Sequence, residues 1–400
     1  MEPHGPVSPL RFGRLPPSGE PIGLSGLARV LWEQEPAKAL ACGLRALLGT
    51  AVITFHASGR EALRVALGRV AAESGRDEVV VPAYTCFSVP AAAVAAGLRV
   101  RLVDVDPDGR IDVSALARLP LERAAAIVVC NLFGVPEPVD TVRKLAEDAG
   151  AAVVDDAAQS LGAAGPEGPA GARGSVGILS FARGKPLSAL GGGAIVSRGE
   201  PPLLDSSIGP ARANAVARAL AYNAALAGPV FRLLSGVPAL GIGKTVYDPE
   251  FVRGAIGGAS LALAAALLPD LAAAAARRAA RARELAAWFR SRTEFTPILP
   301  PEGTTGAFPR LAVRAPTAAA RTRALARLEE LGVGASAMYP SALDAVAALA
   351  PHLAGGPPHV PGARDLAARV VTVPTHGRLR VDLLEAAHGE LRLAPNRGSD

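Results

Sequence analysis

Short runs of apolar, β-branched residues alternate with alanine-rich stretches from residue 50 onward, and this alternation restricts the fold more than any other feature of the chain. Each run is bounded by turn residues, which is typical of a buried strand, and the stretches between the runs suit helices. Strands that are apolar throughout and separated by helices predict an α/β fold with a mostly parallel sheet and helices on both faces. The runs are DEVVVPAY (77–84), LRVRLVDVD (98–106), AAIVVCNLFG (125–134), GAAVVDDAAQ (150–159) and GILSFARG (177–184).

The remaining sequence divides the chain around this core. The 400 residues are 50% hydrophobic and 20% charged, enough to bury a large core and a smaller companion. We expect an N-terminal arm, rich in proline and glycine, over 1–45, and a large domain over 46–260. A long alanine- and arginine-rich helix over 261–291 then leads to a small α+β domain over 292–400.

Composition argues against several classes of function. The formal charge of +6 comes almost wholly from arginines spread along the chain, with only 4% aromatic residues, which indicates a solvated surface and no nucleic-acid interface. Cys42, Cys86 and Cys130 are too widely spaced for a disulfide framework or paired zinc ligands, and the histidines lack metal-ligand spacing. Because the N-terminus has no apolar signal-peptide core, we expect a cytoplasmic protein without a bound metal.

The segment 211–245 is unusually apolar, but arginines and prolines interrupt it. A membrane-spanning helix needs roughly 20 unbroken apolar residues, so we do not expect a span here. Two interpretations stay open: a buried helical insertion or dimer contact, and an amphipathic element that makes weak contact with a membrane surface.

Polar residues follow the apolar runs at the points where strands should end. Asp155 and Asp156 follow AAVV, and Asn131 follows IVVC. Ligands of parallel α/β sheets bind outside the carboxyl ends of the strands, so this edge is the expected site. Taken singly, either aspartate is equally well explained as a helix cap.

Lys185, one of only four lysines, lies between Ser180 and the triple glycine 191–193. Upstream, the stretch HASGREAL (56–63) opens a helical pattern, and a helix N-terminus binds phosphate well. A lysine in a glycine-rich crevice, an acid at a neighbouring strand end and an anion site together are what a pyridoxal phosphate enzyme requires. The amine bonds the cofactor's aldehyde and the acid keeps the pyridine nitrogen protonated.

These motifs together resemble the DegT/DnrJ/StrS family of pyridoxal-phosphate-dependent sugar aminotransferases, which have the aspartate-aminotransferase-like fold type I. The similarity covers roughly residues 50–200 and continues more loosely into the small domain. It implies a large domain with a seven-stranded type of sheet. The motifs that carry it are SGREAL, VPAYTC, VDVDPDGRID, NLFGVP, VVDDAAQS and SFARGKPLSALGGGAIV.

The resemblance assigns roles to individual residues. Lys185 would bond the cofactor and move the proton, and Asp156 would pair with the pyridine nitrogen. Gln159 would reach the cofactor's phenolic oxygen. The remaining implied cofactor contacts are Ser58, Gly59, Arg60, Cys86, Ala158, Ser180 and Arg253, and the expected substrate contacts are Tyr84, Asn131, Tyr339 and His376.

Several positions depart from the family pattern. Cys86 stands where an aromatic ring commonly stacks on the cofactor, and Arg60 replaces a threonine. In the family a loop of the partner subunit, which usually contains an asparagine, completes the phosphate site. This chain aligns FVRGAIGG (251–258) with that loop, so the asparagine is absent and Arg253 would substitute for it. The resemblance therefore implies a homodimer with shared active sites.

The implied reaction transfers an amino group from glutamate or glutamine to a keto-sugar, nucleotide-linked, in polysaccharide or antibiotic biosynthesis. Two alternatives stay open. One is a sugar dehydratase or other elimination enzyme, although the family's dehydratases replace the lysine with histidine. The other is a degenerate, non-catalytic relative with a binding or regulatory role.

Overall fold

The computed structural model describes residues 13–49, 52–198, 212–237 and 245–391. Its main feature is a seven-stranded sheet in the order β1-β9-β8-β5-β4-β2-β3. Strands β3, β2, β4, β5 and β8 run parallel, and β9 lies antiparallel between β8 and β1. The strands are β1 (Val52–His56), β2 (Glu78–Pro82), β3 (Arg99–Val103), β4 (Ala124–Cys130), β5 (Ala152–Asp156), β8 (Val176–Ser180) and β9 (Gly193–Ser197).

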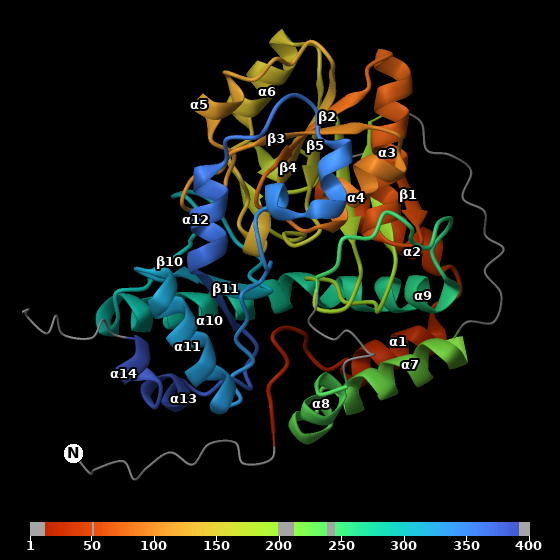
Figure 1. Cartoon of the computed structure of the whole chain (residues 1–400). Coiled ribbons are helices and arrows are strands. Elements are labelled where there is room, and N and C mark those ends of the chain that lie inside the picture. Colours follow the sequence, from red (N-terminus) through yellow and green to blue (C-terminus); the bar gives the residue numbers. More distant parts are fainter. Residues whose placement is uncertain (1–12, 50–51, 199–211, 238–244, 392–400) are drawn as a thin grey trace, which may run out of the picture.

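Helices cover both faces of this sheet (Figure 1), as the apolar strands predict. On one face Val79 and Val81 of β2 pack with α3 (Gly59–Ser74) and α4 (Ser88–Ala95). On the other face Val80 packs with α5 (Val113–Leu116) and α6 (Asp140–Asp148). Farther along that face, β1, β8 and β9 pack on α2 (Pro36–Leu48) and α9 (Gly258–Leu267). The α/β fold class with a mostly parallel sheet is confirmed.

A long helical stretch leads from this large sheet to a smaller one. It consists of α9, the single turn η3 (Leu268–Asp270) and α10 (Leu271–Arg292). The small sheet is antiparallel, in the order β10 (Thr296–Pro297), β11 (Arg310–Arg314) and β12 (Val370–Pro374). Helices α11 (Ala318–Glu330), α12 (Pro361–Arg369), α13 (Val381–Glu385) and α14 (His388–Leu391) accompany it.

Within the described residues one helical stretch, Gly258–Arg292, has the length and hydropathy of a membrane span, and 56% of its apolar window is buried inside the protein. Its α9 part packs between α2 and α7, and residues 259–266 are all buried. A buried core helix has the same composition as a span, so this stretch is accounted for by packing.

The prediction that the N-terminal 45 residues form an extended arm is wrong for residues 24–45. Helix α1 (Leu24–Trp32) and α2 lie within residues 24–48, and α2 buries Leu40 and Leu44 completely. The leucines and alanines of α2 recur at helical spacing, so packing against α9 stabilises a helix there.

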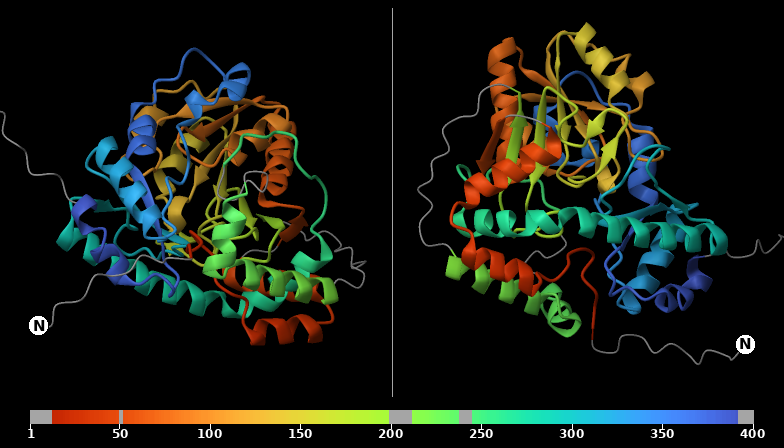
Figure 2. Two further views of the ribbon diagram at one scale, coloured as in Figure 1. Left: turned by 60° about the horizontal axis from the view of Figure 1, so that its bottom comes forward. Right: turned by 180° about the vertical axis from the view of Figure 1, so that it is seen from behind.

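The insertion at 211–245 forms α7 (Arg212–Ala225) and α8 (Gly228–Ser235). Helix α7 lies beside α1 (Figures 1 and 2) and buries Ala215 and Ala219. Helix α8 buries no residue. A buried insertion therefore describes only the inner side of α7; residues 238–244 lie outside the described part of the chain.

Candidate active site

The two adjacent acids at the end of β5 have different environments. Asp155 is completely buried, and its carboxylate faces the buried guanidinium of Arg173 at 2.9 Å. It also accepts hydrogen bonds from the backbone N–H of Gly171 at 2.8 Å and from Asn131 Nδ2 at 2.7 Å. Because every lone pair of this carboxylate is engaged, Asp155 holds the strand end together and is closed to ligands.

Asp156, on the opposite side of the strand, is only partly buried. Its Oδ1 accepts one hydrogen bond, from the backbone N–H of Ala158 at 2.9 Å. Burial raises the pKa of Asp156, and the ammonium group of Lys185 opposes that rise. The structure thus brings the charges of Asp156 and Lys185 together, as the sequence predicts, and leaves Asp156 with bonding capacity for a cationic ligand atom.

Lys185 lies in the loop that follows β8, where Gly184 turns the backbone with a φ of +73°. Its backbone N–H donates to the carbonyl of Ala182 at 3.2 Å, and the side chain is partly buried. Lys185 also lines a cavity of about 390 Å³, whose other walls are residues 19–25, helix α10 and His376. The lysine therefore borders a partly open cavity, and its charge also acts on Asp156 at the end of β5.

The N-terminus of α3 and the end of β8 form a narrow cradle. Ser58 caps α3 by accepting the backbone N–H of Glu61 at 3.0 Å. A Cβ atom on Gly59 would lie 2.7 Å from Cβ of Ser180, so this position tolerates only glycine. The backbone N–H groups at the start of α3 lie close to the Ser180 hydroxyl here, and the N-terminus of a helix suits an anion such as phosphate.

Arg60 follows Gly59, but its side chain is already engaged within the chain. The guanidinium donates to the backbone carbonyl of Asp248 at 3.1 Å and lies 5.1 Å above the ring of Phe251. Arg253 is exposed, near the start of α3. A phosphate contact through the Arg60 side chain would require it to leave these partners, and a contribution of Arg253 to a partner subunit stays a prediction.

Gln159 links the large domain to the C-terminal part of the chain. Its Nε2 donates to the hydroxyl of Tyr339 at 2.8 Å, and its Oε1 accepts the backbone N–H of Phe133 at 3.2 Å. The ring of Tyr339 packs edge-on against Tyr84, with centroids 5.4 Å apart. The structure thus brings the predicted residues Tyr84, Gln159 and Tyr339 together, although both tyrosine rings are buried.

Asn131 does not fit its predicted role as a substrate contact. Its Nδ2 donates to Asp155 and to the carbonyl of Asp156, and its Oδ1 accepts from Arg173 at 2.6 Å and from the Glu137 backbone at 2.9 Å. The residue is 2% exposed. Since the amide has no free donor or lone pair, Asn131 braces the buried ion pair instead.

The other predicted contacts lie around this centre. His376 is buried, and its Nε2 donates to the carbonyl of Pro16 at 2.9 Å, while Nδ1 has no partner among the described residues. Cys86 is partly buried and its Sγ accepts the hydroxyl of Ser88 at 3.0 Å. Ala158 is partly exposed beside Asp156, as a residue packing on a cofactor ring requires.

Sequence reasoning missed Arg310, at the start of β11. Its guanidinium donates to Ser336 Oγ at 3.0 Å and to Ser18 Oγ at 3.4 Å, and no acidic side chain of the described residues pairs with it. Burial lowers the pKa of Arg310. Ser18 in turn lies against Gly184, next to Lys185. Nothing in the sequence distinguishes Arg310 from the other arginines, because its isolation from acids is a property of the folded chain.

Backbone strain concentrates around the same centre. Among the described non-glycine residues with left-handed φ, Phe133 (60°) contacts Gln159 through its N–H, and Met338 (61°) precedes Tyr339. Leu190 (64°) precedes the triple glycine. Residues held in such conformations cost roughly 1–3 kcal/mol each and cluster at ligand sites.

The fold is similar to that of solved aminotransferases. A putative sugar aminotransferase from Streptococcus pneumoniae, solved in its PLP form, superposes with a TM-score of 0.73 over 94% of this chain and 98% of that one, at 18% identity. A DegT DnrJ EryC1 StrS aminotransferase from Brucella abortus superposes with a TM-score of 0.68, at 22% identity, over 92% and 93% of the two chains. These likenesses establish the fold.

Residues 33–207 match the sequence model of the DegT/DnrJ/EryC1/StrS aminotransferase family, and the predicted resemblance is confirmed over this part of the chain. The dTDP-3-amino-3,4,6-trideoxy-α-D-glucose transaminase of Streptomyces venezuelae is 34% identical over 149 residues, which are 37% of this chain and 39% of the relative. The erythromycin biosynthesis sensory transduction protein EryC1 of Saccharopolyspora erythraea is 34% identical over 151 residues, which are 37% of this chain and 40% of that relative. The match therefore spans about two fifths of the curated relatives.

Proposed function

We propose that the protein is a pyridoxal-phosphate-dependent aminotransferase that transfers an amino group from an amino acid to a keto-sugar. The observation that carries this proposal is the placement of Asp156 and Lys185 after the carboxyl ends of the adjacent strands β5 and β8, close enough for the lysine charge to act on the acid, where Asp156 has one hydrogen bond and a raised pKa. Perturbed acids beside a lysine in a cleft are characteristic of catalytic sites.

The residues present fit the cofactor. Lys185 would hold it covalently through Nζ, and the Asp156 carboxylate would pair with the pyridine nitrogen. The backbone N–H groups of Gly59 and Arg60 and the hydroxyl of Ser180 would hold the phosphate, in the cradle that a Cβ on Gly59 would fill. When bound, pyridoxal phosphate supplies an electron sink for the substrate carbanion.

The chain's own groups would then carry out the proton transfer. Lys185 Nζ would take the proton from the substrate carbon that bears nitrogen and return it, as a general base and acid. The partly buried carboxylate of Asp156 would favour the protonated pyridine nitrogen, because an unpaired charge in a desolvated position gains most from an opposite charge. Gln159 and Tyr339 would close the site from the side of the small sheet.

The acceptor class rests on the relatives. The Streptomyces venezuelae relative is a dTDP-sugar transaminase, and another relative, from Acidithiobacillus ferrooxidans, acts on a UDP-linked 3-dehydroglucosamine. A third, from Streptomyces fradiae, is an L-glutamine:2-deoxy-scyllo-inosose aminotransferase. A ketone on a six-membered polyol ring is common to all three, so a nucleotide-linked or free ring ketone is the proposed acceptor, with glutamate or glutamine as donor, in the biosynthesis of amino sugars.

Arg310 is the proposed site for the donor's carboxylate. An unpaired guanidinium that has lost hydration is stabilised by an anion, and every amino-acid donor carries a carboxylate. The Arg310 guanidinium contacts Ser18 Oγ and Met338 Sδ directly. Met338 precedes Tyr339, whose hydroxyl accepts the hydrogen bond from Gln159. Arg310 therefore lies on the side of Lys185 that faces the small sheet.

The first test is spectroscopic. Purified protein is incubated with pyridoxal phosphate, gel-filtered and scanned, together with the Lys185→Ala variant and a matched Lys144→Ala control on the exposed surface of α6. We expect a near-visible band in wild type and in Lys144→Ala, and none in Lys185→Ala. Addition of glutamate or glutamine should shift the wild-type band.

A band that persists in Lys185→Ala would refute the assignment of this lysine. A band that no amino donor shifts would favour the alternative of an elimination enzyme. A GDP-4-keto-6-deoxy-D-mannose-3-dehydratase from E. coli has a similar fold. Absence of any band in wild type would favour a non-catalytic role. The acceptor is then assigned with keto-sugars linked to dTDP and UDP and with 2-deoxy-scyllo-inosose.

We also propose that the active species is a homodimer, because the exposed position of Arg253 near the start of α3 suits a contact with a neighbouring subunit. Light scattering on the cofactor-loaded protein tests this, and an active monomer would contradict it.

A further inference from the structure

Large exposed apolar side chains are concentrated in one part of the molecule. Among the described residues, all but Val113 lie within 24–32 or 220–252. Those on or next to α1, α7 and α8 form what we call the apolar face. Its residues, with their exposed fractions, are Leu24 (85%), Leu31 (52%), Trp32 (72%), Leu220 (53%), Val230 (40%), Leu233 (71%) and Val237 (40%).

The three helices of the apolar face lie together on the underside of the molecule in Figure 1 and come to the front in the left view of Figure 2. Leu24 and Leu31 are two helical turns apart and share one side of α1, while Gly26 and Val30 are buried on another. Helix α8, with the sequence GPVFRLLS, buries none of its residues. A helix with two apolar sides, or an apolar helix with no buried side, has an apolar surface left without a partner among the described residues.

Charge indicates what kind of partner covers this face. Between Asp205 and Asp248 the sequence has four basic residues and no acidic one. Of the four, Arg212 and Arg232 lie on the described helices with their side chains away from the core, Arg218 turns inward to the carbonyl of Leu190, and Lys244 lies outside the described residues. The acids nearest Trp32 in the sequence are Glu33 and Glu35, of which Glu35 pairs with Lys38. Arg232 is exposed on α8, between Phe231 and Leu233. A symmetric contact between two copies would bring this cationic stretch against itself, because a two-fold interface uses the same surface on both subunits. An anionic surface complements it.

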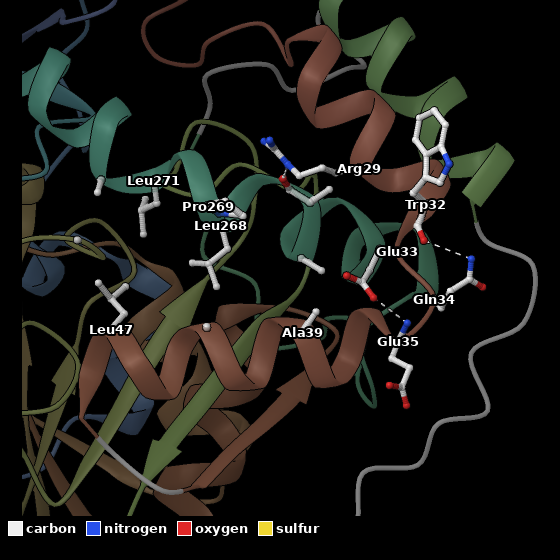
Figure 3. Close-up of a pocket in the computed structure, with 15 residues that line it drawn as sticks. Arg29, Trp32, Glu33, Gln34, Glu35, Ala39, Leu47, Leu268, Pro269 and Leu271 are labelled. Carbon is white, nitrogen blue, oxygen red and sulfur yellow. Dashed lines mark hydrogen bonds between the residues drawn. The ribbon is translucent and has the colours of Figure 1, made fainter.

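An apolar groove of about 760 Å³ adjoins the face. It lies between α1, α2 and the turn from α9 to α10, and Trp32 borders it (Figure 3). Its lining is mostly apolar, with Leu47, Leu268 and Leu271 among the residues that contribute side chains. Trp32 thus belongs both to the apolar face and to a groove of a size and chemistry that accept an acyl chain.

We propose that α1, α7 and α8 dock the protein on an anionic lipid bilayer, with the exposed leucines and Trp32 entering the boundary between headgroups and acyl chains. Basic amphipathic helices bind membranes in this way, through buried apolar area and attraction to anionic headgroups. Tryptophan favours this depth of the bilayer because its ring has both an apolar body and a polar N–H. This docking is independent of the proposed reaction and would bring the enzyme to a membrane where its substrates or products are used.

The full-length protein carries its own probe for the test. It has two tryptophans. Trp32 is exposed, whereas Trp288 is 8% exposed and donates a hydrogen bond to Glu385 at 2.6 Å. A vesicle-dependent blue shift of tryptophan emission therefore reports on Trp32. The protein is mixed with large unilamellar vesicles of phosphatidylcholine alone or with 30% phosphatidylglycerol, at low and at high salt, and is also sedimented with them.

Wild type should co-sediment with the phosphatidylglycerol vesicles, with a blue shift, and high salt should weaken the binding. Leu233→Glu should weaken binding at least about tenfold, because it removes apolar area and adds a charge that the lipids repel. Arg232→Glu should weaken binding to anionic vesicles in the same direction. Val113→Glu, the matched control away from the face, should bind as wild type does. Since α8 buries no residue, both α8 variants should keep the wild-type melting temperature.

Absence of wild-type co-sedimentation, or equal binding by Leu233→Glu and Val113→Glu, would overturn the proposal. Light scattering on the same samples identifies the competing occupant. If wild type ignores vesicles and Leu233→Glu halves the mass in solution, the face is an interface between two copies of this chain.

Discussion

The different roles of the two adjacent aspartates can be tested by replacing each with asparagine. Asp155→Asn leaves the guanidinium of Arg173 buried without a counter-charge, in a place where both side chains are completely inaccessible. One oxygen of Asp155 accepts three N–H groups, from the Gly171 backbone, the Arg173 backbone and Arg173 Nε. An asparagine must place its own N–H₂ group against donors on one side or the other.

Removing one partner of a buried ion pair costs about 3–5 kcal/mol. For a domain of about 200 residues each kcal/mol lowers the melting temperature by roughly 2–4 °C, so we expect Asp155→Asn to melt roughly 6–20 °C below wild type. Asp156→Asn removes a carboxylate that makes one hydrogen bond and whose pKa burial has raised, so its cost should stay below about 1 kcal/mol.

The assay is thermal unfolding of both variants without added cofactor, followed by the absorbance scan with pyridoxal phosphate. Asp156→Asn should melt like wild type but turn over at least about a hundredfold more slowly, as expected for loss of a charge that stabilises a protonated ring nitrogen. The reasoning is refuted if the free energy of unfolding of Asp155→Asn lies within about 1 kcal/mol of the wild-type value, or if Asp156→Asn is the less stable of the two variants.

Three further changes address the cradle, a buried acid and the unpaired arginine. Gly59→Ala places a Cβ 2.7 Å from Cβ of Ser180, so cofactor affinity, measured by absorbance titration, should fall at least about tenfold, and the clash should also lower the melting temperature of the cofactor-free protein; unchanged affinity would remove the cradle from the phosphate site. Burial raises the pKa of Glu137 to about 8, so the folded state holds a proton that the unfolded state lacks, and stability falls as pH rises from about 4.5 through 8. Glu137→Gln should therefore gain at least about 1.4 kcal/mol over wild type between pH 5 and pH 9 in unfolding experiments, and a parallel pH profile would contradict this. Arg310→Met should raise the KM for the amino donor at least about tenfold while leaving cofactor absorbance and melting temperature intact, and an unchanged donor KM would exclude the carboxylate contact.

Local sequence patterns predicted that Lys185 and Asp156 lie near each other. Lys185 and Asp156 each follow an apolar run, and parallel strands present their carboxyl ends at one edge, so order along the chain translated into proximity. The same rule correctly placed Asn131 at that edge, but it did not predict which groups the side chain contacts. The amide turns inward to Asp155 and Arg173, which lie 24 and 42 residues away along the chain.

Contacts from the C-terminal part of the chain were less accessible to prediction. The sequence suggested Tyr339, but its bond to Gln159 joins residues 180 positions apart. Arg310 gave no signal at all, since its significance is the absence of a neighbouring acid in three dimensions. Likewise the apolar composition of 211–245 left burial and contact with a membrane surface both open, whereas in the folded chain none of the α8 residues is buried by the described part of the structure.

The sequence by itself determined the strands, the helices between them and the lysine, acid and glycines of the expected cofactor site, because alternation of apolar runs and strand-end polarity are properties of residues close together in the chain. Only the tertiary structure decided which of two neighbouring acids is sealed by an arginine, that the buried side of Arg310 meets no acid among the described residues, and which apolar helices face outward. Those outcomes depend on burial and pairing between distant segments, and a charge or an apolar side chain acquires its role from what the fold places against it.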